Sequence, residues 1–249
     1  MTRDSRFHVE DLSKDQVRLA PAEGHHAVHV LRLTVGAAVE LFDGRGTIAA
    51  GRIAAIKRQA VDVWIERREA LGMRPGPIVH LAFAAPKGKR LDWLLEKATE
   101  LGAASLQPVL FERSVAGQIT GKLPPTKRQR WQAHCVAAAK QSGLNWLPQI
   151  GDPMPLGEFL EHELFGAAGY FGVVGVAEGA PAVRDVLARA PEGRDVCLLV
   201  GPEGGITREE LAAAAQAGFA PARLGRTVLR VETAAIALLA AVVALHEGR

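Results

Sequence analysis

The chain has 249 residues, and its hydrophobic share of 48% is ample for a packed core, which excludes wholesale disorder. Its two cysteines, Cys135 and Cys197, lack metal-ligand spacing, and its amino terminus lacks the apolar core of a signal peptide. A soluble protein in a reducing, cytoplasmic setting is therefore expected, and the net charge of +3 is too small to indicate a partner by itself.

Residues 1–72 have the pattern of a small β-rich unit. A hairpin turn at 43–46 joins two alternating segments, and a short helix is predicted at 25–33. The strands predicted here are residues 7–9, 38–42, 47–55 and 60–66. Residues 72–77 read Gly-Met-Arg-Pro-Gly-Pro, which continues neither a helix nor a central strand, so we place the domain boundary there.

After this linker, strands and helices alternate, which is typical of a mostly parallel sheet covered on both faces. The predicted strands are residues 78–84, 106–111, 169–176 and 196–200, with a short run at 222–224. The predicted helices are residues 91–101, 126–143, 156–164, 182–190 and 234–246. The last of these is almost wholly apolar but too short to span a bilayer.

Two glycine-containing loops follow strands near the carboxyl end. The first, Gly-Pro-Glu-Gly-Gly at 201–205, precedes a helix whose start is marked by a capping box of Thr207 and Glu210. The second covers residues 225–233. If the two preceding strands are neighbours, the loops lie side by side at the edge where open α/β sheets bind ligands. They would then form a pocket, built mainly from backbone, that suits a planar or nucleoside-like ligand.

Basic residues gather in the middle of the chain. Residues 76–150 carry 10 Lys and Arg against 4 Asp and Glu, whereas residues 151–249 carry 8 against 13. Two basic runs contribute, one around Lys87, Lys89 and Arg90 and one at residues 127–130, where cations oppose a helix dipole. The concentration favours a polyanionic substrate, although a solvated lysine-rich surface fits the charge equally well.

Metal binding and a catalytic triad find no support in the residue spacing. His25 and His29 lie one helical turn apart, but no nearby acidic residue or cysteine completes the three or four ligands that zinc needs. Arg230, by contrast, follows a glycine loop and is well placed to meet an anion or a carbonyl.

Over nearly its whole length, the chain resembles the RsmE-type ribosomal RNA methyltransferases, which modify N3 of a uridine in 16S ribosomal RNA. The resemblance is carried by short motifs in the family's order, of which the last two are the most specific: Arg6-Phe7, His29-Val30-Leu31-Arg32, Leu41-Phe42-Asp43-Gly44, Lys97-Ala98-Thr99-Glu100-Leu101-Gly102, Glu112-Arg113-Ser114, Ala139-Lys140-Gln141-Ser142, Gly201-Pro202-Glu203-Gly204-Gly205, and Leu224-Gly225 with Leu229-Arg230-Val231-Glu232-Thr233.

The resemblance implies an α/β fold in two domains. A small PUA-like RNA-binding β-barrel at residues 1–72 would precede a SPOUT methyltransferase domain at residues 76–249, whose carboxyl end threads a trefoil knot. It further implies a homodimer that binds S-adenosylmethionine in the knot and releases S-adenosylhomocysteine. The expected partner is the 16S ribosomal RNA of the small ribosomal subunit, with neither a metal nor a membrane.

The same resemblance assigns residues to roles. Arg230 and Glu232 are the expected catalytic residues; Arg230 would stabilise charge on the uridine, while Glu232, Glu203 and solvent remain alternatives for the general base. The expected cofactor contacts are Val174, Val176, Gly201, Pro202, Glu203, Gly204, Leu224, Gly225, Leu229 and Thr233. The expected RNA contacts are Arg6, Arg32, Lys87, Lys89, Arg90, Arg113, Gln141 and Asn145.

One position departs from the family pattern. The family usually has an arginine after the glycine of Gln141-Ser142-Gly143, and here Leu144 stands in its place. A guanidinium that can touch RNA is therefore missing, and Asn145, Arg113 and Lys140 are the candidates to replace it.

Two other functions are less well supported by the sequence. A dehydrogenase is disfavoured because the glycine loops are carboxyl-terminal and lack the acidic ribose-binding residue at its expected offset. A non-catalytic RNA-binding protein is disfavoured because the chain keeps the segment from Arg230 to Thr233. Methylation of a different RNA nucleotide is a further alternative.

Overall fold

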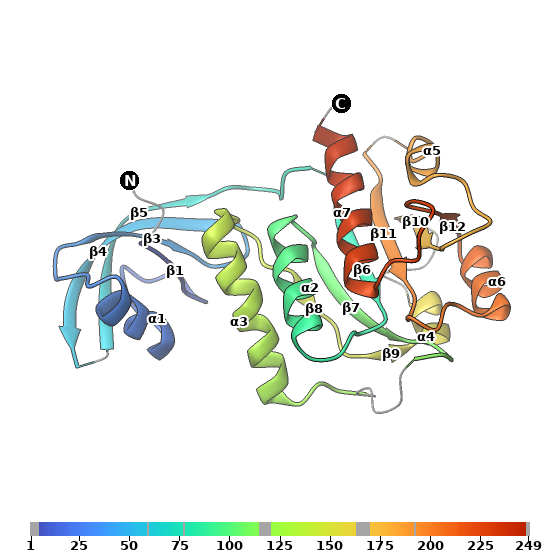
Figure 1. Ribbon diagram of the computed structural model, residues 1–249. Coiled ribbons are helices and arrows are strands. Elements are labelled where there is room, and N and C mark those ends of the chain that lie inside the picture. The colour runs from blue at the N-terminus through green and yellow to red at the C-terminus, as the bar shows by residue number, and fades with distance from the viewer. Residues whose placement is uncertain are drawn as a thin grey trace. The chain divides into compact units, whose positions relative to one another are not determined.

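The computed structural model describes residues 5–58, 60–76, 78–114, 121–162, 170–191 and 193–247 (Figure 1). The chain divides into two compact units. The first comprises Met1–Pro75 together with Val136–Leu147, and the second comprises Gly76–Cys135 with Pro148–Arg249. The segment Val136–Leu147 thus belongs to the first unit, although the sequence-based boundary assigned it to the second domain.

The first unit is built on a five-stranded sheet in the order β1-β3-β4-β5-β2. β1 pairs with β3 in parallel, and the other neighbours are antiparallel. Alternate side chains such as Val39, Leu41 and Val63 point into one buried core, as a half-buried sheet requires. The strands are β1 (Arg6–His8), β2 (Gln16–Arg18), β3 (Ala38–Phe42), β4 (Thr47–Lys57) and β5 (Ala60–Ala70).

The helical segment of the first unit differs from the predicted helix at 25–33. An α-helix, α1 (Pro21–His25), begins earlier because Pro21 fits the first turn, where no N–H is needed. It continues as the π-helix η1 (His26–Val30), in which the Leu31 N–H donates to the His26 carbonyl at 2.9 Å. Arg32 follows with φ 54°, a left-handed conformation that ends the helical segment.

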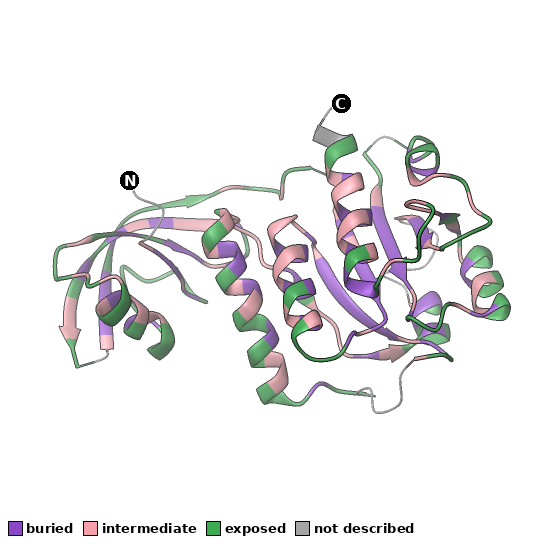
Figure 2. Cartoon of the chain, viewed as in Figure 1, coloured by how far each residue is buried: buried purple, intermediate pink, exposed green. Residues whose placement is uncertain are grey.

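The second unit contains a parallel sheet in the order β12-β10-β11-β6-β7-β8, with β9 also paired to β7. Its central strands are apolar runs buried on both faces, as Figure 2 shows for β6, β7 and β11. The strands are β6 (Val79–Phe83), β7 (Ser105–Leu110), β8 (Gln149–Ile150), β9 (Met154–Pro155), β10 (Tyr170–Gly175), β11 (Asp195–Val200) and β12 (Phe219–Ala222).

Helices connect these strands, and the sheet packs against α7. Leu91, Leu94 and Leu95 form the buried stripe predicted for α2, and α7 packs against α2, β6 and β11. The helices are α2 (Lys89–Glu100), α3 (Pro125–Ser142), α4 (Leu156–Glu161), α5 (Val183–Leu187), α6 (Arg208–Gln216) and α7 (Val231–Glu247). The predicted end of α4 at residue 164 and start of β10 at residue 169 lie outside the described residues.

Neither membrane spans nor metal clusters occur in the described ranges. No helix there combines the length and hydropathy needed to cross a bilayer. No group of three or more His, Cys, Asp or Glu side chains in those ranges is arranged to hold a metal ion. Cys135 and Cys197 are both buried and free, and burial raises the pKa of the Cys135 thiol to about 11, so its reactive thiolate is scarce at neutral pH.

Candidate active site

The first glycine loop leaves the carboxyl end of β11 and enters α6 through the predicted capping box, which the structure confirms. The Thr207 N–H donates to Glu210 Oε2 at 2.9 Å, and the Glu210 N–H donates to Thr207 Oγ1 at 3.2 Å. Gly201 is tightly enclosed, because a Cβ built there would lie 2.3 Å from Ile206 Cγ1. Only glycine therefore fits this position without displacing Ile206.

The second glycine loop leaves β12, which ends at Ala222 rather than at the predicted residue 224, and enters α7 at Val231. The two preceding strands are not neighbours, since β10 lies between β11 and β12 and pairs with both. All three strands are parallel, so their carboxyl ends meet at one edge of the sheet. The segment after β10, residues 175–178, thus completes the wall between the two loops.

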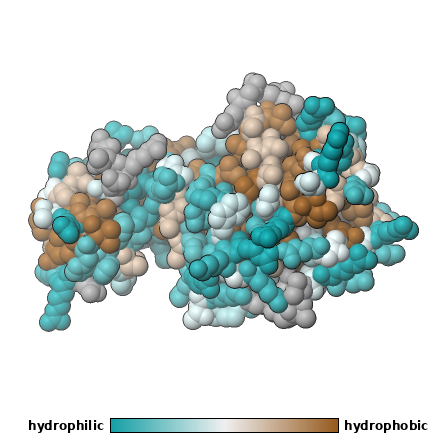
Figure 3. Space-filling model, in the orientation of Figure 1, coloured by the Kyte–Doolittle hydropathy of each residue, from teal (hydrophilic) through white to brown (hydrophobic). Residues whose placement is uncertain are grey.

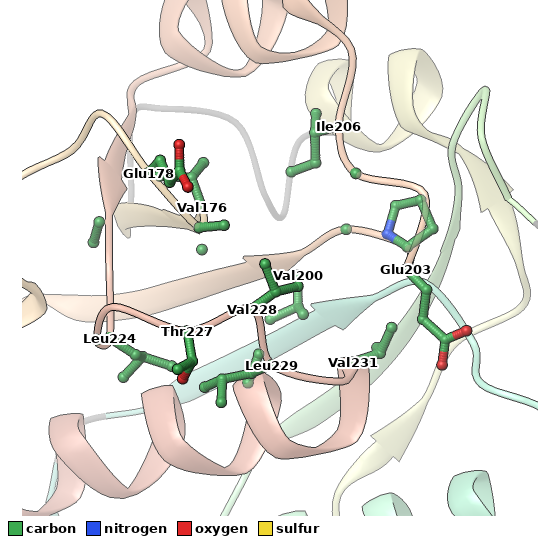
Figure 4. Close-up of a pocket in the computed structure, with 18 of the residues that line it drawn as sticks. Val176, Glu178, Val200, Glu203, Ile206, Leu224, Thr227, Val228, Leu229 and Val231 are labelled. Atoms are coloured by element: carbon green, nitrogen blue, oxygen red, sulfur yellow. The ribbon is translucent and has the colours of Figure 1, made fainter.

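These three segments enclose a cavity of about 340 Å³ (Figure 4). Seven of the ten predicted cofactor residues line it: Val176, Gly201, Pro202, Glu203, Leu224, Gly225 and Leu229. The other three do not. Val174 is 1% exposed within the core, Gly204 packs against Arg113, and Thr233 is exposed in the first turn of α7.

Several cavity residues were not identified from the sequence. They come from the segment after β10, the end of β11, the two loops and the first turns of α6 and α7. Glu178 is the most informative, because it brings a carboxylate to the cavity and Figure 4 places it beside Val176. The others include Ala177, Val200, Ile206, Leu211, Thr227, Val228, Val231 and Ala234. A carboxylate just beyond a predicted strand end is the signal that could have indicated Glu178.

Two arginines expected to bind RNA contact the first glycine loop instead. Arg90, in the first turn of α2, forms an ion pair with Glu203, whose carboxylate points away from the cavity in Figure 4. Arg113 Nη1 donates to the Gly204 carbonyl at 3.3 Å. Both side chains remain partly exposed, so these contacts hold the loop without burying either charge.

The two expected catalytic residues flank the start of α7. Arg230 is exposed and lies between Leu229 and Val231, which both line the cavity, while its carbonyl accepts the Ala234 N–H at 2.9 Å. Glu232 is 7% exposed, and its buried Oε2 has no hydrogen-bond partner among the described atoms. The amino end of a helix favours a carboxylate, which offsets part of the cost of burying it.

Arg6 is a structural residue of the first unit rather than an exposed RNA contact. It is 5% exposed, and its guanidinium donates to the carbonyls of Ala139 at 3.1 Å and Leu144 at 2.7 Å. It also donates to Asn145 Oδ1, which occupies that amide oxygen as well. The expectation that Arg6 contacts RNA therefore does not fit its burial.

The remaining expected RNA residues are exposed. Arg32 follows η1, Lys87 and Lys89 lie around the start of α2, and Gln141 is in the last turn of α3. Lys140, a candidate to replace the family arginine at Leu144, instead pairs with Glu23 at 2.6 Å. Lys140 and Asn145 both make contacts within the first unit. Arg113 is therefore the candidate to replace the family arginine whose side chain stays exposed.

Comparison with known proteins places this fold and site in a class. Residues 74–243 match the family model of an RNA methyltransferase domain, and residues 19–66 match that of an RNA methyltransferase PUA domain. The chain is thus a member of the class of RNA methyltransferases whose methyltransferase domain follows a PUA domain.

Similar proteins identify the family within this class. The ribosomal RNA small subunit methyltransferase E of Synechocystis is 32% identical over 242 residues, which cover 96% of this chain and 76% of the relative. The Bacillus subtilis protein of the same name is 28% identical over 253 residues and covers 95% of both chains. The chain belongs to the ribosomal RNA small subunit methyltransferase E family.

Solved structures agree over the whole chain. A Legionella pneumophila methyltransferase in complex with the cofactor SAM matches with a TM-score of 0.86 and 30% identity, covering 98% of each chain. The Neisseria gonorrhoeae ribosomal RNA small subunit methyltransferase E, bound to S-adenosyl methionine, matches with a TM-score of 0.82 and 27% identity, covering 97% of this chain and 98% of the other.

Proposed function

We propose that this protein transfers a methyl group from S-adenosylmethionine to N3 of a uridine in 16S ribosomal RNA within the small ribosomal subunit. The observation that carries the proposal is the cavity formed by the loops after β10, β11 and β12 in a chain of this family. Relatives that match it over nearly their whole length were solved with the same cofactor. A substrate in the ribosome also places the protein in the cytoplasm.

The cavity residues fit this cofactor. A volume of about 340 Å³ lies within the range of small-molecule sites, and its walls combine apolar side chains with the backbone of two glycine loops. The apolar side chains Val176, Leu224 and Leu229 would enclose the adenine, and the Glu178 carboxylate would accept hydrogen bonds from ribose hydroxyls. When bound, S-adenosylmethionine supplies an electrophilic methyl group on a sulfonium sulfur.

The residues at the start of α7 would act on the uridine. Removal of the N3 proton leaves negative charge on the neighbouring carbonyl oxygens, and the exposed Arg230 guanidinium would stabilise it. Glu203 is a weaker candidate for the general base, because its carboxylate is paired with Arg90. Glu232, with one carboxylate oxygen that has no partner in the described structure, is the base we propose.

We also propose that the protein is a homodimer that associates through α7. Leu245 on this helix is 40% exposed, and Figure 3 shows hydrophobic surface over it. Val228, just ahead of α7, is 77% exposed. Exposed apolar surface of this kind supports an interface. A monomeric mass in sedimentation equilibrium would contradict this.

A trefoil knot and an RNA-binding barrel complete the proposal. The chain leaves β12 at the edge of the sheet, passes the ends of β10 and β11, and packs α7 on β11 and β6. That crossing supports a knot around the loop of residues 201–205. The five strands of the first unit, with its PUA match, support a PUA-like barrel that binds RNA.

Mapping of ribosomal RNA methylation tests the function directly. In cells that lack this protein, mass spectrometry of 16S ribosomal RNA should show one uridine without its N3 methyl group, and the purified protein with S-adenosylmethionine should restore it. Methylation of another nucleotide would overturn the assigned substrate. Stabilisation against heat by NAD, without any by S-adenosylmethionine or S-adenosylhomocysteine, would instead favour a dehydrogenase.

Substitution of Gly201 by alanine should weaken cofactor binding. The new Cβ would meet Ile206 Cγ1 at 2.3 Å, so Ile206 must shift, and both residues line the cavity. Overpacking of this kind costs about 1–3 kcal/mol, which corresponds to a loss of affinity of roughly 5- to 160-fold. Titration calorimetry with S-adenosylhomocysteine measures it.

Gly157→Ala is the matched control, because Gly157 lies in α4 outside the cavity lining and a Cβ there meets no atom within 4 Å. Its affinity should stay within about twofold of the wild type. Equal losses in the two variants would show that the clash with Ile206 is not the cause.

A further inference from the structure

A second cavity, of about 220 Å³, lies in the second unit between the amino ends of α2 and α3, and we call it the α2–α3 cavity. These two helices begin at the same end of the pair in Figure 1. We propose that the α2–α3 cavity binds one phosphate, with part of its adjoining nucleotide, in a single-stranded segment of the RNA substrate. The inference rests on the proposed function and adds to it a binding site outside the cofactor cavity.

The α2–α3 cavity collects cations from two basic runs far apart in the sequence. Lys87 comes from the loop after β6, and Lys127 and Arg130 come from the first turns of α3. Asp92 is the one acidic residue among the described residues that line it. Three cations against one carboxylate leave a net positive lining, as a site for an anion requires.

The two helix ends add to this positive charge. The first turn of α2 begins at Lys89, next to Gly88 in the lining, and α3 carries no acidic residue in its first turn. The amino end of a helix carries partial positive charge that favours phosphate, and this holds at α3 although its Lys127 N–H already donates to the Pro124 carbonyl at 2.9 Å. Cations there oppose the dipole of α3, and an anion in the cavity would offset that cost.

The contacts of the basic residues at 127–130 distinguish side chains that can bind an anion in the cavity from a side chain that stabilises the fold. Arg128 donates to the Ile150 carbonyl at 2.6 Å and pairs with Asp152, so it stabilises the fold. Arg130 pairs with Asp92 across the cavity, which fixes its guanidinium in the lining. Lys127 Nζ lies 5.6 Å from the centre of the Trp131 ring and remains half-exposed.

The rest of the lining is apolar and suits the uncharged part of a nucleotide. Trp131 is 2% exposed and forms the floor, and Pro86, Leu91 and Val109 contribute walls. A volume of about 220 Å³ is below the range of sites for whole cofactors, so it fits one sugar or base and a phosphate. Cations around an apolar floor are what single-stranded nucleic acid needs for binding.

The salt dependence of RNA binding tests the proposal. Fluorescence anisotropy would measure the affinity of the full chain for a labelled single-stranded RNA oligonucleotide at several KCl concentrations. A plot of log K against log salt has a negative slope. Removing one cation that binds a phosphate reduces the magnitude of this slope by about 0.7 for single strands. Lys127→Gln should reduce the magnitude of the slope by about 0.7, and the double variant Lys87→Gln/Lys127→Gln should reduce it by about 1.4. Lys127→Arg keeps the charge and should have the slope of the wild type.

Arg189→Gln is the matched control, since it removes one exposed cation of the second unit just after α5 and outside the cavity lining. Its slope should equal that of the wild type. Equal slopes in Lys127→Gln, Arg189→Gln and the wild type would overturn the cavity as an RNA site, even if the wild type methylates ribosomal RNA. A wild type that binds RNA but transfers no methyl group would overturn the proposed function, and the slopes would still decide on the cavity.

Discussion

Replacement of Arg230 by alanine should lower the rate of methyl transfer about a hundredfold and leave cofactor affinity within about twofold of the wild type. Loss of one group that stabilises developing negative charge costs on the order of 3 kcal/mol, which gives the expected rate. Arg230 does not line the cofactor cavity, so binding should not change. Single-turnover methylation of small subunits, with calorimetry for S-adenosylhomocysteine, separates the two quantities.

Arg226→Ala is the control for charge, because Arg226 is an exposed arginine of the same loop that also lies outside the cavity lining. Its rate should remain near that of the wild type. Equal rates in Arg230→Ala and Arg226→Ala would remove Arg230 from the mechanism. In the same assay, Glu232→Gln should lower the rate of methyl transfer, because an amide cannot accept the N3 proton, and an unchanged rate would rule out Glu232 as the base.

The sequence carried enough information to locate the elements and one helix start. β6 and β11 are apolar runs of strand length, and both are buried as such runs require. The capping box of Thr207 and Glu210 is a local hydrogen-bond pattern, and the structure contains both of its bonds. Features of this kind depend on residues three or four apart, so the sequence predicts them well.

The order of strands could not be predicted in the same way. Nothing local indicates that β10 lies between β11 and β12, because strand order is set by pairing over long distances in the sequence. Val176 was expected to contact the cofactor, but without that order Glu178 could not be recognised as a carboxylate of the same cavity. The sequence pattern predicts the two glycine loops, whereas the position of the Glu178 side chain between them depends on the fold.

The two compact units differ from the sequence-based boundary at the segment Val136–Leu147 for a related reason. The helical pattern of α3 continues to Ser142, and no proline or glycine marks the point where its contacts pass to the first unit. The Arg6 guanidinium makes hydrogen bonds to residues 133, 138 and 139 positions away. Arg6 was therefore expected to contact RNA, whereas in the structure its guanidinium has the structural role of bonding to the segment Val136–Leu147.

That role has a measurable consequence in stability. Arg6→Ala should destabilise the first unit by about 3 kcal/mol, because it leaves the Leu144 carbonyl and Asn145 Oδ1 without the guanidinium that donates to them. It also removes the guanidinium that lies 4.2 Å from the centre of the Phe42 ring and pairs with Glu40 at 2.9 Å. Hydrogen exchange of peptides from β3 and β4 in increasing urea would measure the unfolding of the first unit separately from that of the second.

Comparison with Arg67 distinguishes a buried guanidinium from an exposed one in the same sheet. Arg67 pairs with Glu69 on the surface with its side chain 75% exposed, so Arg67→Ala should cost less than about 1 kcal/mol. Arg6→Lys should fall between the two, because an ammonium keeps the charge but cannot reach several acceptors in one plane. If Arg6→Ala unfolds like the wild type but binds RNA more weakly, Arg6 is an RNA contact after all, and the segment Val136–Leu147 is held by other residues.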